Sequence, residues 1–129
     1  VVAPNADRYM DRKEVAVSPV ESTTDHLDLV FPTVKSVSPI VEKAINNTIK
    51  KYVAKVQNDV EKLNAKESDK TNVVMYYDVK TDKNGVFSVL IHTYTMRDRD
   101  ANGVNYVKGF TFNTTTGRQL SLVALTKKN

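Results

Sequence analysis

The strongest constraint on the fold is one apolar stripe of helical period between Ser38 and Asn64. Its members recur every three or four residues, the spacing that places side chains along one side of an α-helix. They are Val41, Ile45, Ile49, Tyr52, Val56, Val60 and Leu63. Ser38 fits the N-cap, and Pro39 fits the first helical position, where the missing amide hydrogen has no helical partner. At about 1.5 Å per residue the helix is roughly 40 Å long, so it must lie across a sheet.

Two short strands are predicted before this helix. Apolar and polar residues alternate over Glu14–Glu21 and over His26–Phe31, which is the two-residue period of a half-buried strand. Proline cannot donate a hydrogen bond to a neighbouring strand, so Pro19 and Pro32 place each strand at a sheet edge or end it there. Residues 1–13 lack any sustained period and are predicted to be a flexible leader.

Three further strands are predicted after the helix, over Val73–Lys80, Val86–Met96 and Val104–Asn113. Each alternates apolar residues on at least one face. The pairs Asn84-Gly85 and Asn102-Gly103 separate them, and such pairs tolerate the positive φ of tight hairpin turns. The sequence therefore predicts an antiparallel three-stranded meander, with the long helix packed on one of its faces.

The end of the chain is predicted to form a short helix after a turn at Thr114–Gly117. Ser121 is its candidate cap, and its apolar residues are Leu120, Leu122 and Leu125. Residues 14–129 then make one α+β domain: two short strands, one long helix on a three-stranded meander, and a short C-terminal helix.

Composition excludes several classes of protein. At 129 residues, with 40% hydrophobic and 26% charged residues, the sequence is typical of one globular domain. Its apolar runs are far shorter than the roughly 18 residues of a bilayer crossing, so no membrane span is predicted. Cysteine is absent, which excludes disulfides, thiolate zinc sites and thiol nucleophiles.

The charge of the chain is uneven. The net charge is +4, and the residues beyond Asp100 contain no acid but four cations, namely Lys108, Arg118, Lys127 and Lys128. This pattern is compatible with an anionic partner or with an ordinary solvated surface. The solvated surface is favoured, because the cations are scattered and not grouped with aromatics as nucleic-acid recognition requires. No nucleic-acid partner is predicted.

No catalytic motif is recognisable. The four glycines stand singly, so no phosphate-binding loop is present, and serine-nucleophile signatures are missing. Asp78 and Asp82 flank a predicted turn with nothing to mark a cleft. His26 and His92 are lone strand histidines, which are usually structural, and a metal site or a dyad would need them to converge with a carboxylate. The prediction is a protein that is not an enzyme and has no cofactor, with calcium as the one candidate metal.

The calcium candidate is Asp98-Arg99-Asp100-Ala101-Asn102-Gly103, which reads as the first half of an EF-hand loop. Asp98, Asp100 and Asn102 would supply oxygen ligands at alternate positions. Its twelfth position, however, is Gly109 and not the bidentate glutamate, and the segment joins two predicted strands. An acidic hairpin loop is the favoured interpretation, because Asp, Asn and Gly are also the residues that turns prefer.

Tyrosines on the meander strands are the candidate binding residues. Tyr76, Tyr94 and Tyr106 could stack on sugar rings or fill a groove in a partner, because tyrosine is amphipathic and common at interfaces. The alternative is structural: the three rings cover sheet edges or pack under the helix.

Several short motifs carry a family resemblance. Phe31-Pro32-x-Val34, followed by Ile45-Asn46-Asn47-x-Ile49, resembles the opening of the domain that precedes the catalytic module in PdaC-type peptidoglycan deacetylases. The closing segment resembles the ending of that domain and runs from Phe110-Thr111-Phe112-Asn113 through Thr116-Gly117-Arg118-Gln119-Leu120-Ser121-Leu122 to Leu125. The ectodomain of RsiV-type anti-sigma factors, which sense lysozyme, is similar in style. Asn113 stands where the family often has Asp, so no catalytic role is carried over.

The resemblance implies an extracytoplasmic place in a bacterial cell envelope. It implies no activity, because the chemistry of those deacetylases resides in a separate module. The expected function is a non-catalytic binding or sensing module that contacts cell-wall glycan or a protein partner such as lysozyme. The alternative is a structural accessory domain that positions a neighbouring module or self-associates.

Overall fold

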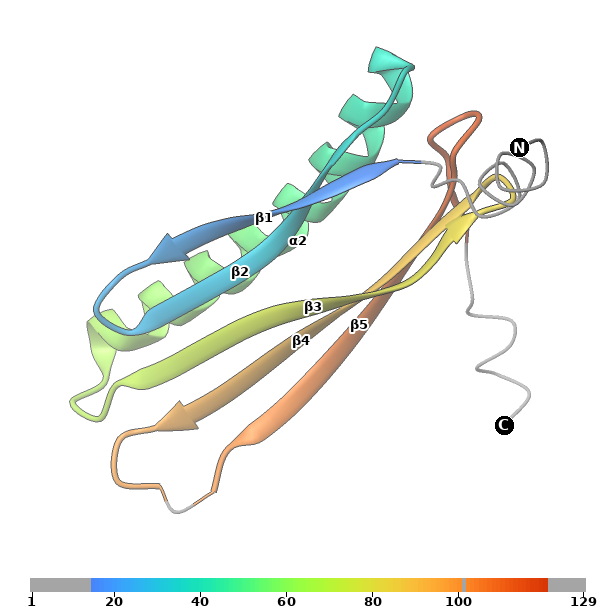
Figure 1. The fold of residues 1–129 in the computed structure, drawn as a ribbon. Helices are drawn as coiled ribbons and strands as arrows, with labels where there is room; N and C mark the ends of the chain where they lie inside the picture. The colour runs from blue at the N-terminus through green and yellow to red at the C-terminus, as the bar shows by residue number, and fades with distance from the viewer. Residues whose placement is uncertain (1–14, 101, 121–129) are drawn as a thin grey trace.

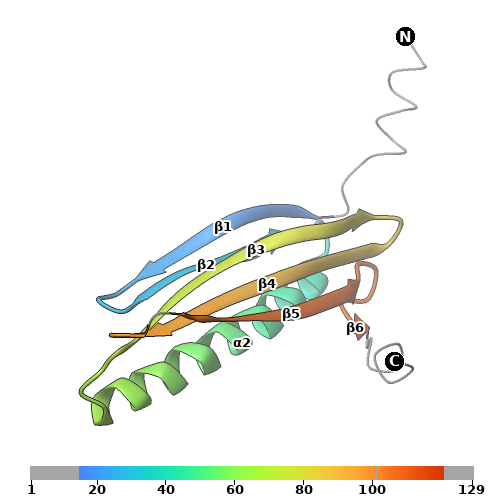
Figure 2. The ribbon, with the colours of Figure 1, turned by 90° about the horizontal axis from the view of Figure 1, so that it is seen from below.

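The described residues form one six-stranded sheet with one long helix across one face (Figure 1). The structure, a computed structural model, describes residues 15–100 and 102–120. Neighbouring strands follow chain order from β1 to β6, and all pair antiparallel except β2 with β3. The elements are β1 (Ala16–Thr23), β2 (Leu27–Lys35), α2 (Pro39–Lys66), β3 (Thr71–Lys83), β4 (Val86–Arg97), β5 (Val104–Asn113) and β6 (Gln119–Leu120). Figure 2 shows α2 below the sheet, along its length.

The helix begins where the sequence predicts. The Ser38 hydroxyl accepts a hydrogen bond from the Val41 amide at 3.4 Å, and Pro39 takes the first helical position. The helix extends to Lys66, about half a turn past the predicted end. Most of the predicted apolar stripe packs against the sheet, which confirms the helical period, but Leu63 at its end is exposed and Val53, outside the predicted stripe, is buried.

The sheet is larger than the predicted meander, and the expectation of a three-stranded sheet is wrong. β3, β4 and β5 do form an antiparallel meander, but β2 joins it by pairing Leu27–Leu29 in parallel with Val73–Met75. A parallel neighbour needs a long crossover connection, and α2 supplies one of 28 residues. The hairpin of β1 and β2 therefore extends the same sheet on the other side of β3.

Pro19 lies on β1, the outer strand of the sheet, whereas Pro32 does not end β2. Pro19 and Pro32 stand opposite each other in the β1–β2 register, and β2 continues to Lys35. In such a facing pair, the bond that each proline lacks would point away from the other strand. For Pro19 that direction is the outer edge of β1. For Pro32 it is the side on which β2 has already separated from β3, whose pairing stops at Leu29.

Two asparagines of α2 bond the strands where β2 and β3 do not pair. The Asn46 amide group accepts from the Val34 amide at 2.8 Å and donates to the Val34 carbonyl at 2.9 Å. Asn64 does the same for Thr71, at 2.7 and 3.0 Å. A primary amide offers the same donor and acceptor as a peptide group, so each side chain replaces a missing strand neighbour.

The core lies between α2 and the sheet. Its largest fully buried side chains come from four strands and the helix, and Phe87 stacks near Phe112 with ring centroids 6.4 Å apart. They include Leu29, Ile45, Ile49, Met75, Phe87, Ile91 and Phe112. Every second residue of β3 and β4 points into this core, which leaves the alternate residues on the opposite face of the sheet.

The structure contradicts the start of the predicted C-terminal helix. Leu120, its first predicted apolar residue, lies in β6 and pairs with Thr111. Ser121, Leu122 and Leu125 lie outside the described residues, as does the predicted leader 1–13. The turn before β6 packs on the helix, where a Cβ on Gly117 would stand 3.0 Å from the Ala44 Cβ. Among the described residues no helix is long and apolar enough to cross a membrane.

Candidate functional site

The candidate site is the face of the sheet turned away from α2, here called the open face. No element of the described residues covers it, and Figure 2 shows α2 on the other side. Four large apolar side chains of β3, β4 and β5 are exposed on it: Val74 at 45%, Tyr76 at 48%, Tyr94 at 36% and Val107 at 52%. Scattered exposed apolar residues are ordinary, but adjacent ones on one sheet face form a patch, which makes this face the candidate interaction surface.

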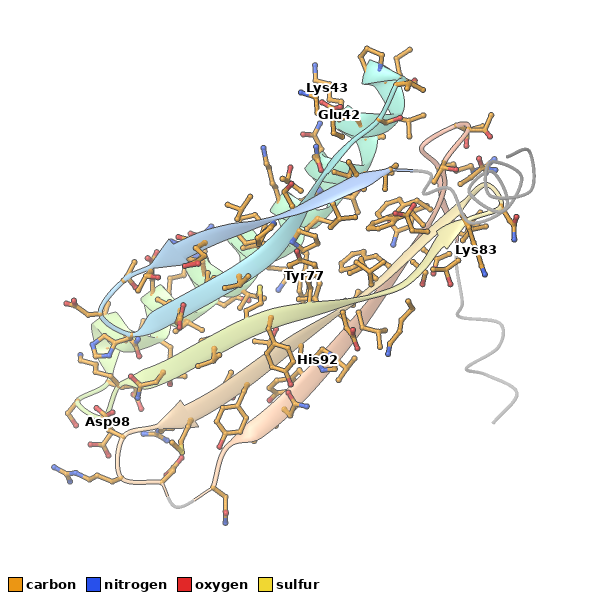
Figure 3. The ribbon with its side chains drawn as sticks, in the orientation of Figure 1. Glu42, Lys43, Tyr77, Lys83, His92 and Asp98 are labelled. Carbon is orange, nitrogen blue, oxygen red and sulfur yellow. The ribbon has the colours of Figure 1, made fainter. Side chains whose placement is uncertain are left out.

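A stacked pair of rings stands at the centre of the open face. Tyr76 lies opposite His92 in the β3–β4 register, and their ring centroids are 4.6 Å apart with planes only 5° from parallel. Figure 3 labels His92 midway along β4. The His92 Nδ1 atom is buried and has no hydrogen-bond partner among the described residues. Val107, opposite His92 on β5, continues this apolar row across the next strand.

Tyr94 lies diagonally across from Tyr76, and its ring packs against the backbone of Gly103. It pairs with Val74 on β3 and with Asn105 on β5. A Cβ on Gly103 would overlap the ring and hydroxyl of Tyr94 and would stand 2.7 Å from the Thr95 carbonyl oxygen. Only glycine lets the backbone approach the ring this closely.

Polar groups surround the aromatic patch. Asn72, on β3, donates from its amide to the Met96 carbonyl at 3.2 Å, and Ser88 is 3.1 Å from Thr111 between their hydroxyl oxygens. Asn105 is exposed beside Tyr94. The open face thus combines exposed rings with the Asn105 amide and the Ser88 and Thr111 hydroxyls, groups of the kind that can orient a polar ligand, whereas both N–H donors of Asn72 are already engaged.

Of the three predicted binding tyrosines, the structure brings two together and separates the third. Tyr76 and Tyr94 share the open face. Tyr106 pairs with Thr93, whose side chain faces the helix side and is only 3% exposed, so Tyr106 lies on the opposite face of the sheet. Tyr106 is nonetheless 55% exposed, because it lies towards the end of β5 that α2 does not cover.

The predicted calcium ligands lie at the β4–β5 turn. The Asp98 carboxylate accepts from the Asn72 amide at 2.8 Å and from the Lys70 backbone amide at 3.2 Å, and these bonds lower the pKa of Asp98, the Asn72 bond most strongly. Asp98 thus ties the turn to the start of β3. Asp100 and Asn102 follow it in the turn, without a hydrogen bond shown to Asp98. The described residues contain no group of three or more His, Asp or Glu side chains placed to hold a metal ion.

The other polar candidates are each engaged in holding the fold. His26 Nδ1 is 3.1 Å from the Asn72 side-chain oxygen, where β2 and β3 begin, and it does not contact His92. Asp82 accepts from the Val15 amide at 2.9 Å, and Asp78 pairs with Lys80 at 2.9 Å on the surface. The two histidines therefore do not converge.

Sequence reasoning missed three members of the open face. His92 has been read as a lone strand histidine, although a β3–β4 register counted from the Asn84-Gly85 turn would have placed it opposite or near Tyr76. Val107 could have been placed on the open face, because it alternates with the core residues Phe110 and Phe112 on the same strand. Gly103 has been read as a turn residue, and nothing local to it predicts the contact with Tyr94.

The comparisons with known proteins concern the fold alone. No family model and no curated protein matches the sequence. The fold is similar to a DUF3298 family member from Bacteroides fragilis, at a TM-score of 0.51 and 13% identity over 91% of this chain. It is also similar to a DUF3298 family protein from Pseudomonas aeruginosa, at a TM-score of 0.53 and 11% identity over 85% of this chain. This chain spans 66% and 55% of those two chains. Its architecture is therefore one that occurs in proteins of a domain family of unknown function.

Proposed function

We propose that this domain is a non-catalytic binding module of the bacterial cell envelope that contacts cell-wall glycan through the open face. The observation that carries the proposal is the exposed aromatic patch of Tyr76, stacked on His92, and Tyr94. A pyranose ring presents a C–H face that packs on an aromatic ring, and its hydroxyls need amide or hydroxyl partners. The open face offers both kinds of group, and Asn105 lies directly beside Tyr94.

The shape of the open face favours an extended ligand over a small one. The patch runs across three strands of a sheet and is not enclosed, whereas sites for small molecules are concave and bury most of the ligand. A polymer compensates for weak contact per unit by touching several rings at once. The extracytoplasmic location belongs to the same proposal and rests on the resemblance to envelope domains.

Sedimentation with purified peptidoglycan tests the proposal. We expect the wild-type domain to co-sediment and the double variant Tyr76→Ser/Tyr94→Ser to stay in solution. Each lost ring should weaken binding about five- to tenfold, since aromatic contacts contribute about 1 kcal/mol each beyond area burial. Tyr106→Ser is the matched control, because Tyr106 is at least as exposed but lies on the other face.

Two results would contradict the proposal. One is a wild-type domain that stays in solution, and the other is a Tyr106→Ser variant that loses as much binding as the open-face double variant. A parallel pull-down with lysozyme separates the two partner classes. Binding to lysozyme and not to peptidoglycan, lost in the open-face variant, would replace glycan by a protein partner at the same residues.

A further inference from the structure

A second surface, on the helix side of the sheet, carries a row of lysines. A groove of about 610 Å³ runs along one flank of α2. Its lining includes Lys51, Lys55 and Lys62, with Asn58 and Asp59 between them. All five side chains are exposed, so the groove is open to solvent and not part of the core.

This flank of the helix faces β5. Tyr52, which also lines the groove, contacts Phe110 edge-on with ring centroids 5.4 Å apart. The Lys108 ammonium stands 5.9 Å above the same Phe110 ring. A fourth cation, from a different element, therefore stands beside the ring that Tyr52 contacts, although Lys108 and Phe110 do not line the groove.

The lining of the groove contains three lysines and only one acid, so its net charge is positive. Its one acid, Asp59, is paired with Lys55 at 3.0 Å. The other two acids of α2, Glu42 and Glu61, do not line the groove. Lys51, Lys62 and Lys108 form no ion pair with any residue that the structure describes, and they create a local positive potential that attracts an anion.

The spacing of the lysines favours a chain of anions over a single one. Lys51 and Lys62 are three helical turns apart, or about 16 Å along the axis, so one phosphate group cannot touch both. Three of its lining residues are lysines, which carry N–H donors and no acceptor, and Asn58 and Asp59 add acceptors between them. A phosphodiester or phosphoanhydride chain carries a negative charge and acceptor oxygens on every unit, which complements a row of lysines.

We propose that this groove binds a linear phosphate polymer, with Lys51, Lys55 and Lys62 along the chain and Lys108 as a nearby cation on β5. The site is separate from the open face and lies across the sheet from it. The inference therefore goes beyond glycan contact by Tyr76 and Tyr94 and does not depend on it.

Titration of the full chain with inorganic polyphosphate, followed by calorimetry, tests the groove. The variant Lys51→Glu/Lys62→Glu should lose about tenfold or more in affinity. The matched control is Lys43→Glu/Lys50→Glu, which changes the net charge equally at two exposed lysines of α2 outside the groove. Figure 3 labels Lys43 near the start of the helix, and Lys43 is not among the groove's lining residues. The control should retain most of the affinity. Lysine and glutamate have similar helix propensity, so both variants should fold.

The outcomes distinguish specific binding in the groove from non-specific attraction by the positive charge of the protein. Equal losses in the two double variants would overturn the groove and leave only non-specific attraction. An absence of polyphosphate binding by the wild-type chain would also overturn it. Poly-glutamate binding as tight as polyphosphate would assign the groove to an acidic protein instead. None of these results affects peptidoglycan binding by the open face, which the same variants should retain.

Discussion

Gly103 shows how one absent side chain shapes the candidate site. Its backbone lies where any Cβ would overlap the Tyr94 ring and press on the Thr95 carbonyl. The ring can swing aside, but the backbone carbonyl cannot move without disturbing the β4–β5 ladder. The position of Tyr94 on the open face therefore depends on a residue that makes no side-chain contact of its own.

We expect Gly103→Ala to displace the Tyr94 ring and to lower the free energy of unfolding by about 1–3 kcal/mol. Chemical denaturation measures the stability, and peptidoglycan sedimentation measures the effect on binding. Gly109→Ala is the control, because its Cβ would meet only the Leu90 side chain, at 3.4 Å. Equal stability of the two variants would show that the backbone contact near Gly103 relaxes at no cost.

Asp98 gives a prediction about pH. Its pKa is lowered in the folded state, so the unfolded chain binds more protons in the acidic range and stability rises with pH there. The stabilisation is complete above the ordinary carboxyl pKa of 3.8 and is lost as pH falls through the lower folded value. Asp98→Asn should unfold more easily than wild type at neutral pH, and the difference should shrink under acid. Thermal melts from neutral to acidic pH measure it, and a gap independent of pH would contradict the role of the carboxylate.

The roles of some residues could be predicted from the sequence, and those of others could not. The N-cap at Ser38 was predictable because it depends on a bond to Val41, three residues away. The face of Tyr106 was also within reach, because it is in phase with Phe110, a core residue on the same strand. The stacking of His92 on Tyr76 needs the register of two strands, which no single residue encodes.

At the scale of elements, α2 is hydrogen-bonded to two strands that diverge from each other. Asn46 and Asn64 are five helical turns apart, so they lie on the same line of the helix, about 27 Å from each other. One bonds Val34 near the end of β2, and the other bonds Thr71 at the start of β3. The helix thereby fixes the divergence of β2 from β3 at both ends of their short contact.

We expect Asn46→Ala to destabilise the domain by about 1–3 kcal/mol, because it leaves the buried Val34 peptide groups without partners. Asn47→Ala is the control, since Asn47 is the exposed neighbour on the helix. Denaturant unfolding compares the two. Hydrogen exchange at the Val34 amide should rise selectively in the Asn46 variant, and unchanged protection there would argue that water replaces the side chain.

The elements that the sequence predicted are those with local signals. The N-cap of α2 and the Asn84-Gly85 turn each depend on a few adjacent residues, and the structure confirms both. In the β4–β5 turn, by contrast, Gly103 has no positive φ, and Arg99 has one. The parallel contact of β2 with β3 joins residues about 46 positions apart, from Leu27 to Val73, and involves only three pairs. Such a contact leaves no local pattern, so the six-stranded sheet could not be predicted from strand periodicity alone.

At the scale of the whole molecule, the sheet separates two surfaces of different chemistry. The open face is aromatic and nearly uncharged at its centre, with Tyr76 and Tyr94 exposed. The groove on the helix side is lined by lysines and faces β5. Between them lies the buried core of Phe87, Ile91 and their neighbours, which contains no ion pair shown to link the two faces.

This separation predicts that the two proposed ligands bind without affecting each other. Coupling between sites requires that each ligand favour one of two conformations, and a packed core between two rigid faces offers no second arrangement. We therefore expect peptidoglycan binding to be the same with and without saturating polyphosphate. A variant that combines Tyr76→Ser/Tyr94→Ser with Lys51→Glu/Lys62→Glu should lose both activities additively, because the two sets of side chains share no contact. Competition between the ligands would mean instead that a single surface binds both, and the variant that abolishes both at once would identify it.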